Sequence, residues 1–292
     1  MIRCFGKSNV IDDYEVLKMT IERAQKLKDY LQELESVVVA FSGGVDSSFL
    51  AAAAYKALGD KAVAVTAVSE TLSETEKMEA RKTAAAIGIK HEELWISELE
   101  DSDFVANNGD RCYHCKHTRF SALIAWAQEN GYKWVIDGSN VDDLCDYRPG
   151  MKAIKELEGV CSPLLENGLG KEDIRSLSKV WGLPTWNKLS MPCLSSRIAY
   201  GEKITPERLH QVEQAEEIIR KYVKGPVRVR HHGVLARIEV DAKLLGVLVI
   251  PEVAANINKE ITALGFKYVT FDLAGYRSGS LNDQLPDLKK EA

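Results

Sequence analysis

The stretch Val37–Leu58 reads VVVAFSGGVDSSFLAAAAYKAL and combines a β-branched run, a glycine-rich turn and an alanine-rich segment. Val37–Phe41 predicts a buried strand, and Ser47–Leu58, which is followed by Gly59, predicts a helix. The glycines between them let the main chain approach a ligand closely. Because the first N–H groups of a helix and its dipole favour anions, this strand, loop and helix predict a phosphate-binding site.

Strands and helices alternate on both sides of this stretch. An amphipathic helix is expected first, at Tyr14–Leu34. The segments that follow are predicted strands at Ala62–Val68, Lys90–Ile96 and Lys133–Asp137 and predicted helices at Ser73–Ile87 and Thr118–Glu129. This alternation predicts an α/β fold, an open parallel sheet with helices on both faces.

The pattern changes near Tyr200 to a smaller α+β unit. Its expected elements are helices at Thr205–Val223 and Glu252–Leu264 and strands at Val227–Arg230, Leu235–Val240 and Tyr268–Leu273. We therefore expect four parts: an N-terminal helical segment (1–35), the α/β domain (36–200), the C-terminal α+β domain (201–283) and a tail (284–292).

Composition and charge narrow the class of protein. The 292 residues are 45% hydrophobic and 28% charged, as in folded globular proteins. Thirty-eight Lys and Arg against 43 Asp and Glu give a net charge of −5, so no global positive field attracts RNA. Apolar stretches are too short to span a bilayer, and no signal peptide is recognisable. We expect a cytoplasmic protein with reduced thiols, no membrane or nucleic-acid partner, and assembly as a homo-oligomer.

Three of the six cysteines have ligand-like spacing. Cys112 and Cys115 form a C-x-x-C pair in a loop before a helix, and Cys193 lies about eighty residues further on. Three thiolates can hold a four-iron four-sulfur cluster and leave one iron open for exogenous sulfide. The alternative is zinc, with His114 or His117 completing the ligands. The other cysteines are expected to be inert small hydrophobes: Cys4, Cys145 and Cys161.

The alternation of valine and arginine in the predicted strand Val227–Arg230 places two arginines on one face of that strand. Arg228 and Arg230 alternate with valines that enter the core, and paired guanidinium forks suit a phosphate. Glu239 and Arg237 share a face of the next strand, and Glu216 lies on the preceding helix. The alternative for these charges is a solvated sheet face.

The glycine-rich loop resembles the PP-loop of the ATP pyrophosphatases, which cleave ATP to AMP and pyrophosphate while adenylating an oxygen. It lacks the Gly-Lys-Ser/Thr of a Walker A motif. The resemblance implies ATP and Mg²⁺ as cofactors. Candidate acidic residues for Mg²⁺ are Asp46, Asp142 and Asp143, although the last two also suit a solvated loop. The ATP-binding residues it implies are Ser42, Gly43, Gly44, Asp46, Ser47 and Ser48.

Further segments resemble the LarE family within this superfamily, over roughly Val37 to Asp283. These segments are Asp137–Asp143, Asp146–Gly150, Trp186–Lys188, Cys193–Arg197, Tyr200–Gly201, Val227–Arg230, Tyr268–Leu273 and Gly275–Gly279. The resemblance implies an ATP-dependent sulfurtransferase that adenylates the carboxylates of a pyridinium mononucleotide and converts them to thiocarboxylates for a nickel-pincer cofactor. Sulfide or a sulfur carrier would be the donor. The substrate-site residues it implies are Ser196, Arg197, Glu216, Arg228, Arg230, Glu239 and Arg277.

The chain departs from the sacrificial LarE type, which donates the sulfur of its own cysteine and has no C-x-x-C pair. Pro192 stands where that donor is expected. The pattern of Cys112, Cys115 and Cys193 resembles cluster-bearing members instead, so these three are expected to be the catalytic and metal-binding residues. The alternatives are a cluster-dependent tRNA thiolase, a PP-loop amide synthetase and a non-catalytic nucleotide-binding module.

Overall fold

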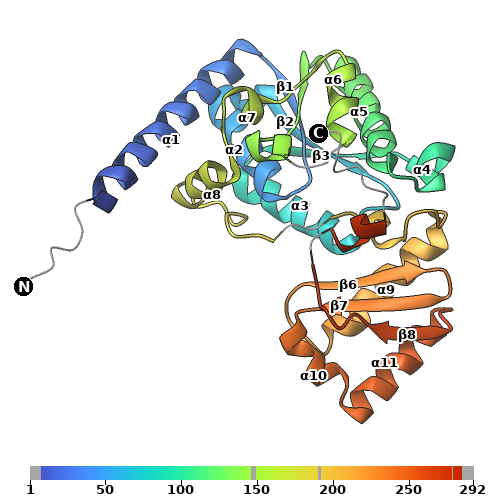
Figure 1. The fold of residues 1–292 in the computed structure, drawn as a ribbon. Helices are drawn as coiled ribbons and strands as arrows, with labels where there is room; N and C mark the ends of the chain where they lie inside the picture. The colour runs from blue at the N-terminus through green and yellow to red at the C-terminus, as the bar shows by residue number, and fades with distance from the viewer. Residues whose placement is uncertain (1–7, 146–148, 190–191, 278, 285–292) are drawn as a thin grey trace, which may run out of the picture. The chain divides into compact units, whose positions relative to one another are not determined.

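The computed structural model describes residues 8–145, 149–189, 192–277 and 279–284 (Figure 1). Internal contacts divide the chain into two compact units. Unit 1 comprises residues 1–68, 75–96 and 116–191, and unit 2 comprises residues 69–74, 97–115 and 192–292. Residues 69–74, 97–115 and 192–200 thus group with the C-terminal sheet, although no sequence pattern indicated it. The four-part division expected above stays a prediction.

Unit 1 contains a five-stranded parallel sheet, which confirms the expected fold class. Its strands, in spatial order, are β3 (Lys90–Trp95), β2 (Ala62–Val68), β1 (Val37–Ala40), β4 (Trp134–Ile136) and β5 (Val160–Cys161). The central strand β1 pairs Val38 with Val63 on one side and with Val135 on the other. The loop that follows β1 therefore leaves the middle of the sheet.

Helices cover both faces of this sheet, and the valines of β1 alternate between the two layers. Val37 and Val39 pack in one core, and Val38 packs in the other. The first core takes side chains from α1 (Ser8–Glu33), α2 (Val45–Leu58), α3 (Glu74–Ile87) and α8 (Lys171–Val180). The second takes them from α5 (Arg111–Glu129) and α6 (Pro149–Glu156), while short α7 (Pro163–Glu166) contacts α1.

Unit 2 contains a three-stranded sheet packed against helices, as expected for a small α+β unit. Strands β6 (Val227–His232) and β7 (Leu235–Val240) are antiparallel, and β8 (Tyr268–Phe271) runs parallel to β7 (Figure 1). The helices are α4 (Ser102–Ala106), α9 (Pro206–Arg220), α10 (Leu245–Leu248) and α11 (Pro251–Ala263). Short 3₁₀ helices lie in unit 2 at Glu98–Glu100, Leu194–Arg197, Ala242–Leu244 and Ser280–Gln284, and in unit 1 at Gly59–Lys61 and Val141–Cys145.

The C-x-x-C pair lies within a helix, which corrects the expectation of a loop. Helix α5 begins at Arg111, and the N–H of Tyr113 donates to the carbonyl of Asp110 at 2.7 Å. The helical apolar pattern of α5 starts only near Phe120, so the sequence pattern did not reveal the earlier turns. Cys112 and Cys115 are consequently three residues apart on a helix and project from the same side.

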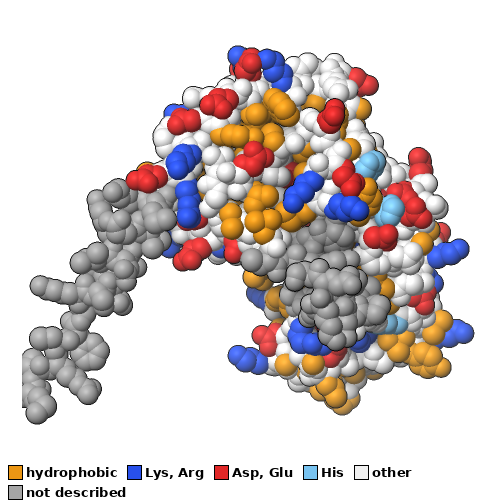
Figure 2. Space-filling view, turned by 45° about the horizontal axis from the view of Figure 1, so that its top comes forward, with side chains coloured by type: hydrophobic (Ala, Val, Ile, Leu, Met, Phe, Trp, Pro, Cys, Tyr) orange, Lys and Arg blue, Asp and Glu red, His pale blue; other side chains and the backbone are white. Residues whose placement is uncertain are grey.

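Charged side chains of both signs are mixed on the surface. Acidic and basic groups are interspersed on the face that Figure 2 displays. Among the described residues, no helix combines the length and the apolar character that crossing a bilayer requires.

Candidate functional site

The glycine-rich loop turns sharply between β1 and α2. Gly43 has a φ of +65°, a conformation that side-chain-bearing residues rarely adopt. A Cβ at Gly43 would also lie 2.8 Å from the Cα of Ala80 on α3. Only glycine fits this position, so the helix–loop packing depends on it.

Hydroxyl groups hold the loop in shape. The Oγ atoms of Ser42 and Ser47 are 3.1 Å apart, and the N–H of Gly44 donates to Ser42 Oγ at 3.3 Å. Gly44 is the N-cap of α2 and provides no side-chain acceptor for the first turn of the helix. The N-terminus of α2 is therefore suited to an anion. Ser48 is fully buried, and its hydroxyl has no partner among the described residues.

A cavity of about 210 Å³ adjoins this loop. Its lining residues are Ser42, Gly44, Val45, Asp46, Glu76, Lys171, Arg175, Lys188 and Leu189. Three cations therefore face the same cavity as the helix N-terminus, beside two carboxylates. None of the three cations was expected at this cavity. The available signals were the family-like segment that ends at Lys188 and the KEDIR stretch of α8, where Lys171 and Arg175 are four residues apart.

The carboxylates of the two further acidic candidates for Mg²⁺ accept hydrogen bonds from backbone N–H groups. Asp142 Oδ2 accepts from the N–H of Lys171 at 2.6 Å, and Asp143 Oδ2 accepts from the N–H of Asn140 at 3.1 Å. Neither lines the cavity. Of the three acidic candidates, Asp46 alone does so.

In unit 2, a cavity of about 140 Å³ gathers three of the expected substrate-site residues. Its lining residues are Arg111, Pro192, Ser196, Tyr200, Arg228, Arg230, Tyr276, Gly279, Leu281 and Asn282. Arg228 lies over the ring of Tyr276 at 5.3 Å, and Arg111 lies over that of Tyr200 at 5.1 Å. Burial of Arg228, with the nearby charge of Arg197, lowers its pKa. The cavity suits a phosphate or carboxylate.

Three other expected substrate-site residues take part in buried ion pairs: Arg197, Glu216 and Glu239. Arg197 Nε donates to Glu216 Oε1 at 2.8 Å, and Arg230 Nη2 donates to Glu239 Oε2 at 2.8 Å. Burial opposes the charge of Glu216, but Arg197 and then Arg220 and Arg228 lower its pKa. Both pairs are less than a tenth exposed, so a solvated charged face is excluded for them.

Arg277 does not line this cavity. Its guanidinium is about half exposed and is paired with Asp283 at 3.4 Å. The neighbouring Tyr276 lines the cavity instead.

A buried arginine links the two cysteine segments. Arg111 Nη1 donates to Asn107 Oδ1 at 2.7 Å and to the carbonyl of Ser195 at 3.0 Å. Asn107 is fully buried with a φ of +57°, and its amide donates to the carbonyl of Ala199 at 2.8 Å. Burial opposes the charge of Arg111, but Cys112 and Cys193 raise its pKa.

The third thiol has a different neighbour. Cys115 Sγ donates to Oε1 of the fully buried Glu98 at 3.3 Å, and Thr71 Oγ1 donates to Glu98 Oε2 at 3.3 Å. A lone buried glutamate has no recognisable signal in the sequence, so this contact was not expected.

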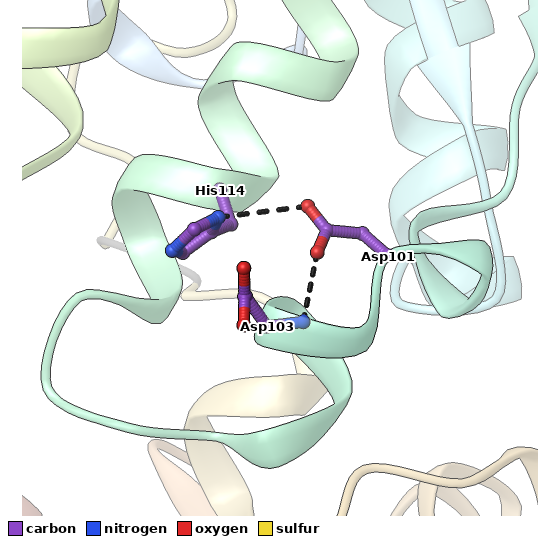
Figure 3. A group of neighbouring side chains, drawn as sticks. All are labelled: Asp101, Asp103 and His114. Carbon is purple, nitrogen blue, oxygen red and sulfur yellow. Dashed lines mark hydrogen bonds and ion pairs between the residues drawn. The ribbon is translucent and has the colours of Figure 1, made fainter.

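Zinc, with His114 or His117 as a further ligand, stays the alternative to a cluster at these cysteines. Tetrahedral Zn–S bonds of about 2.3 Å place sulfur atoms about 3.8 Å apart. In the part of the chain that the structure describes, the group close enough for one ion is Asp101, Asp103 and His114 (Figure 3). The thiols of Cys112, Cys115 and Cys193 do not lie that close to one another. His114 Nδ1 faces Asp101 at 3.6 Å and Nε2 faces Asp110 at 3.5 Å, so its ring is turned to carboxylates.

Of the three cysteines expected to be inert, the structure describes the side chain of Cys161. Burial raises the pKa of Cys161 to about 11, consistent with an inert thiol. Cys4 and the side chain of Cys145 lie outside the described residues.

Comparisons with known proteins place these features in a family. The NAD synthase family matches residues 19–121. An uncharacterized protein from Synechocystis is 43% identical over 264 residues, which cover 90% of this chain and 98% of that protein. Pyridinium-3,5-bisthiocarboxylic acid mononucleotide synthase from Lactiplantibacillus plantarum is 38% identical over 257 residues, with coverage of 87% and 92%. A glutamine-hydrolyzing GMP synthase chain from Pyrococcus abyssi is 26% identical over 223 residues, with coverage of 71% and 70%.

The parallel sheet, the phosphate loop and these matches define a PP-loop enzyme that uses ATP. Within that class, the chain belongs to the LarE family of sulfurtransferases, to which the L. plantarum synthase belongs.

Proposed function

We propose that this chain uses ATP to adenylate the carboxylates of a pyridinium dicarboxylate mononucleotide and then converts them to thiocarboxylates. The name of the L. plantarum relative supports this substrate. We further propose that Cys112, Cys115 and Cys193 hold a four-iron four-sulfur cluster, that sulfide or a sulfur carrier is the donor, and that the chain acts as a cytoplasmic homo-oligomer.

One observation carries the proposal: the cysteine segments adjoin the arginine cavity of unit 2. Pro192 and Ser196, on either side of Cys193, line the cavity, and so does Arg111, which precedes Cys112. A carboxylate substrate whose phosphate is bound by Arg228 and Arg230 would therefore lie near the thiols. Proximity of this kind is what sulfur transfer to an activated carbonyl requires.

A carboxylate oxygen is a poor leaving group, so the carboxylate must be activated before sulfur can replace that oxygen. A carboxylate oxygen attacks the α-phosphorus of ATP, the bond to the β-phosphate oxygen breaks, and pyrophosphate departs with that electron pair. A sulfur nucleophile then adds to the carbonyl carbon, and AMP departs with the former carboxylate oxygen. Arg228 and Arg230 orient the substrate phosphate through charge-assisted hydrogen bonds.

The donor sets suit the two inorganic cofactors. Asp46 and Glu76 supply the carboxylate oxygens that Mg²⁺ prefers, and the ion would neutralise phosphate charge there. Two thiols lie on one helical turn, and Cys193 lies two residues before Ser195, whose carbonyl accepts from Arg111. These three thiolates would be the ligands of a cluster, which when bound supplies an open iron for sulfide.

The substrate assignment predicts a selective effect at Arg228. The Arg228→Gln variant should bind the dicarboxylate mononucleotide about ten- to a hundredfold more weakly, since one charge-assisted fork is lost, while ATP binding stays unchanged. Arg228→Lys should recover only part of the affinity, because lysine keeps the charge without the fork. Isothermal titration calorimetry with each ligand measures both.

Arg208→Gln is the matched control, since Arg208 is an arginine of the same unit that pairs with Glu202 outside the cavity. Its affinities should equal those of the wild type. Equal losses for ATP and the mononucleotide in Arg228→Gln would contradict the assignment. Arg230 is the poorer test, because its removal leaves the buried Glu239 without its partner.

A further inference from the structure

Two segments that are far apart in the sequence carry the three expected cysteine ligands. Cys112 and Cys115 lie near the end of residues 97–115, and Cys193 lies about eighty residues further on. Both segments belong to unit 2. The position of Cys193 relative to the other two thiols therefore depends on contacts between the segments rather than on one local turn.

Arg111 joins these two segments. It is the first residue of helix α5 and is only 5% exposed. One of its nitrogens, Nη1, donates both to Asn107 Oδ1 at 2.7 Å and to the carbonyl of Ser195 at 3.0 Å. A single buried side chain thus connects the residue before Cys112 to a carbonyl two residues after Cys193.

Asn107 holds the partner of Arg111 in place. It ends helix α4 with a φ of +57°, in the left-handed region that asparagine tolerates better than most residues. Its amide nitrogen donates to the carbonyls of Ala199 at 2.8 Å and Glu202 at 2.9 Å. Because Asn107 Oδ1 accepts from Arg111, both ends of this buried amide are engaged, and Arg111 binds an acceptor of fixed position.

A second set of hydrogen bonds restrains the same segments. The N–H of Leu194, the residue after Cys193, donates to the carbonyl of Thr71 at 3.0 Å. The hydroxyl of Thr71 donates to the fully buried Glu98, to which the thiol of Cys115 also donates. Thr71 thus restrains the chain at Leu194, and Arg111 restrains it at the next residue.

Arg111 also carries a positive charge into this region. Its guanidinium lies over the ring of Tyr200 at 5.1 Å, and no carboxylate pairs with it among the residues that the structure describes. A buried charge is costly unless a group of opposite charge compensates it. Because the thiolate is the form of cysteine that ligates metals, ligation at the neighbouring Cys112 would supply negative charge beside Arg111.

We infer that Arg111 is the positioning residue of the cysteine site: its hydrogen bonds hold the segment that carries Cys193 against the start of α5, and its charge offsets that of the ligating thiolates. The inference rests on the proposed function, since it takes Cys112, Cys115 and Cys193 as the ligands. Both measurements below are made without substrate, so the place of Arg111 in the lining of the arginine cavity does not affect them.

Hydrogen–deuterium exchange of the iron-free protein tests the hydrogen bonds of Arg111. In Arg111→Gln, the amides of residues 194–201 should exchange at least about tenfold faster, since a buried charge-assisted hydrogen bond is lost, while those of β6 and β7 keep wild-type rates. Arg111→Lys should recover part of the protection, because one ammonium nitrogen can donate to both acceptors as Nη1 does. Lys221→Gln, which removes an exposed lysine paired with Glu260 elsewhere in unit 2, should match the wild type.

Iron retention tests the consequence for the cysteine site. After reconstitution without oxygen, Arg111→Gln should lose iron to a chelator at least about tenfold faster than the wild type, although all three cysteines remain, and Arg111→Lys should be intermediate. If Arg111→Gln does not fold, Arg111→Lys is the test, and its exchange and its iron loss should both exceed those of the wild type.

Two results would overturn the inference. One is wild-type exchange or wild-type iron retention in the Arg111 variant tested. The other is faster exchange throughout unit 2, including β6 and β7, which would mark a general loss of stability. Wild-type protein that takes up no iron would instead contradict the proposed cluster, and the exchange rates would still decide whether Arg111 holds the segment of Cys193.

Discussion

Replacing any one of Cys112, Cys115 and Cys193 with serine is expected to remove the iron and abolish sulfur transfer while ATP cleavage continues. Protein purified without oxygen should contain about four irons per chain, and each variant should lose nearly all of them, since two thiolates seldom retain what three hold. Pyrophosphate release should persist, because the phosphate loop lies in unit 1 and the three thiols lie in unit 2. Iron analysis, visible absorption and pyrophosphate release measure the three effects.

Cys161→Ser is the control for this series. Cys161 lies in unit 1, and burial raises its pKa to about 11, so its thiol has no expected role in ligation. The variant should retain full iron and full activity. Full iron content in any one of the three serine variants would contradict the assignment of that cysteine.

The second large effect is expected at the phosphate loop. Asp46→Ala and Ser47→Ala should each lower pyrophosphate release on the order of a hundredfold, as removal of one preorganised group at a transition state does. Ser47 supports the loop through Ser42, and Asp46 lines the cavity. Stability should change much less, since a carboxylate in the first turn of a helix contributes about 1 kcal/mol or less. A coupled pyrophosphate assay and thermal unfolding measure both.

Ser178→Ala serves as the matched control, since Ser178 is a fully buried serine of the same unit that does not line the cavity. Its turnover should be that of the wild type. Unchanged turnover in both Asp46→Ala and Ser47→Ala would rule out a phosphate-binding role for this loop.

The local parts of the fold were predictable because their signals are short-range. Val37–Leu58 carries its own strand, turn and helix signals, and the structure places β1 and α2 there. The valine–arginine alternation of β6 likewise predicted which side chains enter the core. Such patterns depend on the period of one element, which the sequence displays directly.

Contacts between distant segments were not predictable. Arg111 has no pattern in the sequence, and its burial arises from Asn107 and the carbonyl of Ser195, 84 residues away. The hydrogen bonds that Arg175 donates to the carbonyls of Trp186 and Lys188 depend in the same way on tertiary packing. The roles of Arg111 and Arg175 therefore depend on the three-dimensional arrangement of elements that are distant in the sequence.

The measurement that tests the central claim most directly is the number of sulfur atoms transferred per chain. Protein reconstituted without oxygen and supplied with ATP, sulfide and the dicarboxylate mononucleotide should form more than one thiocarboxylate per chain, and the peptide containing Cys193 should keep its mass. A limit of one sulfur per chain, with a loss of about 34 Da from that peptide as H₂S is removed, would contradict the account and identify Cys193 as a sacrificial donor.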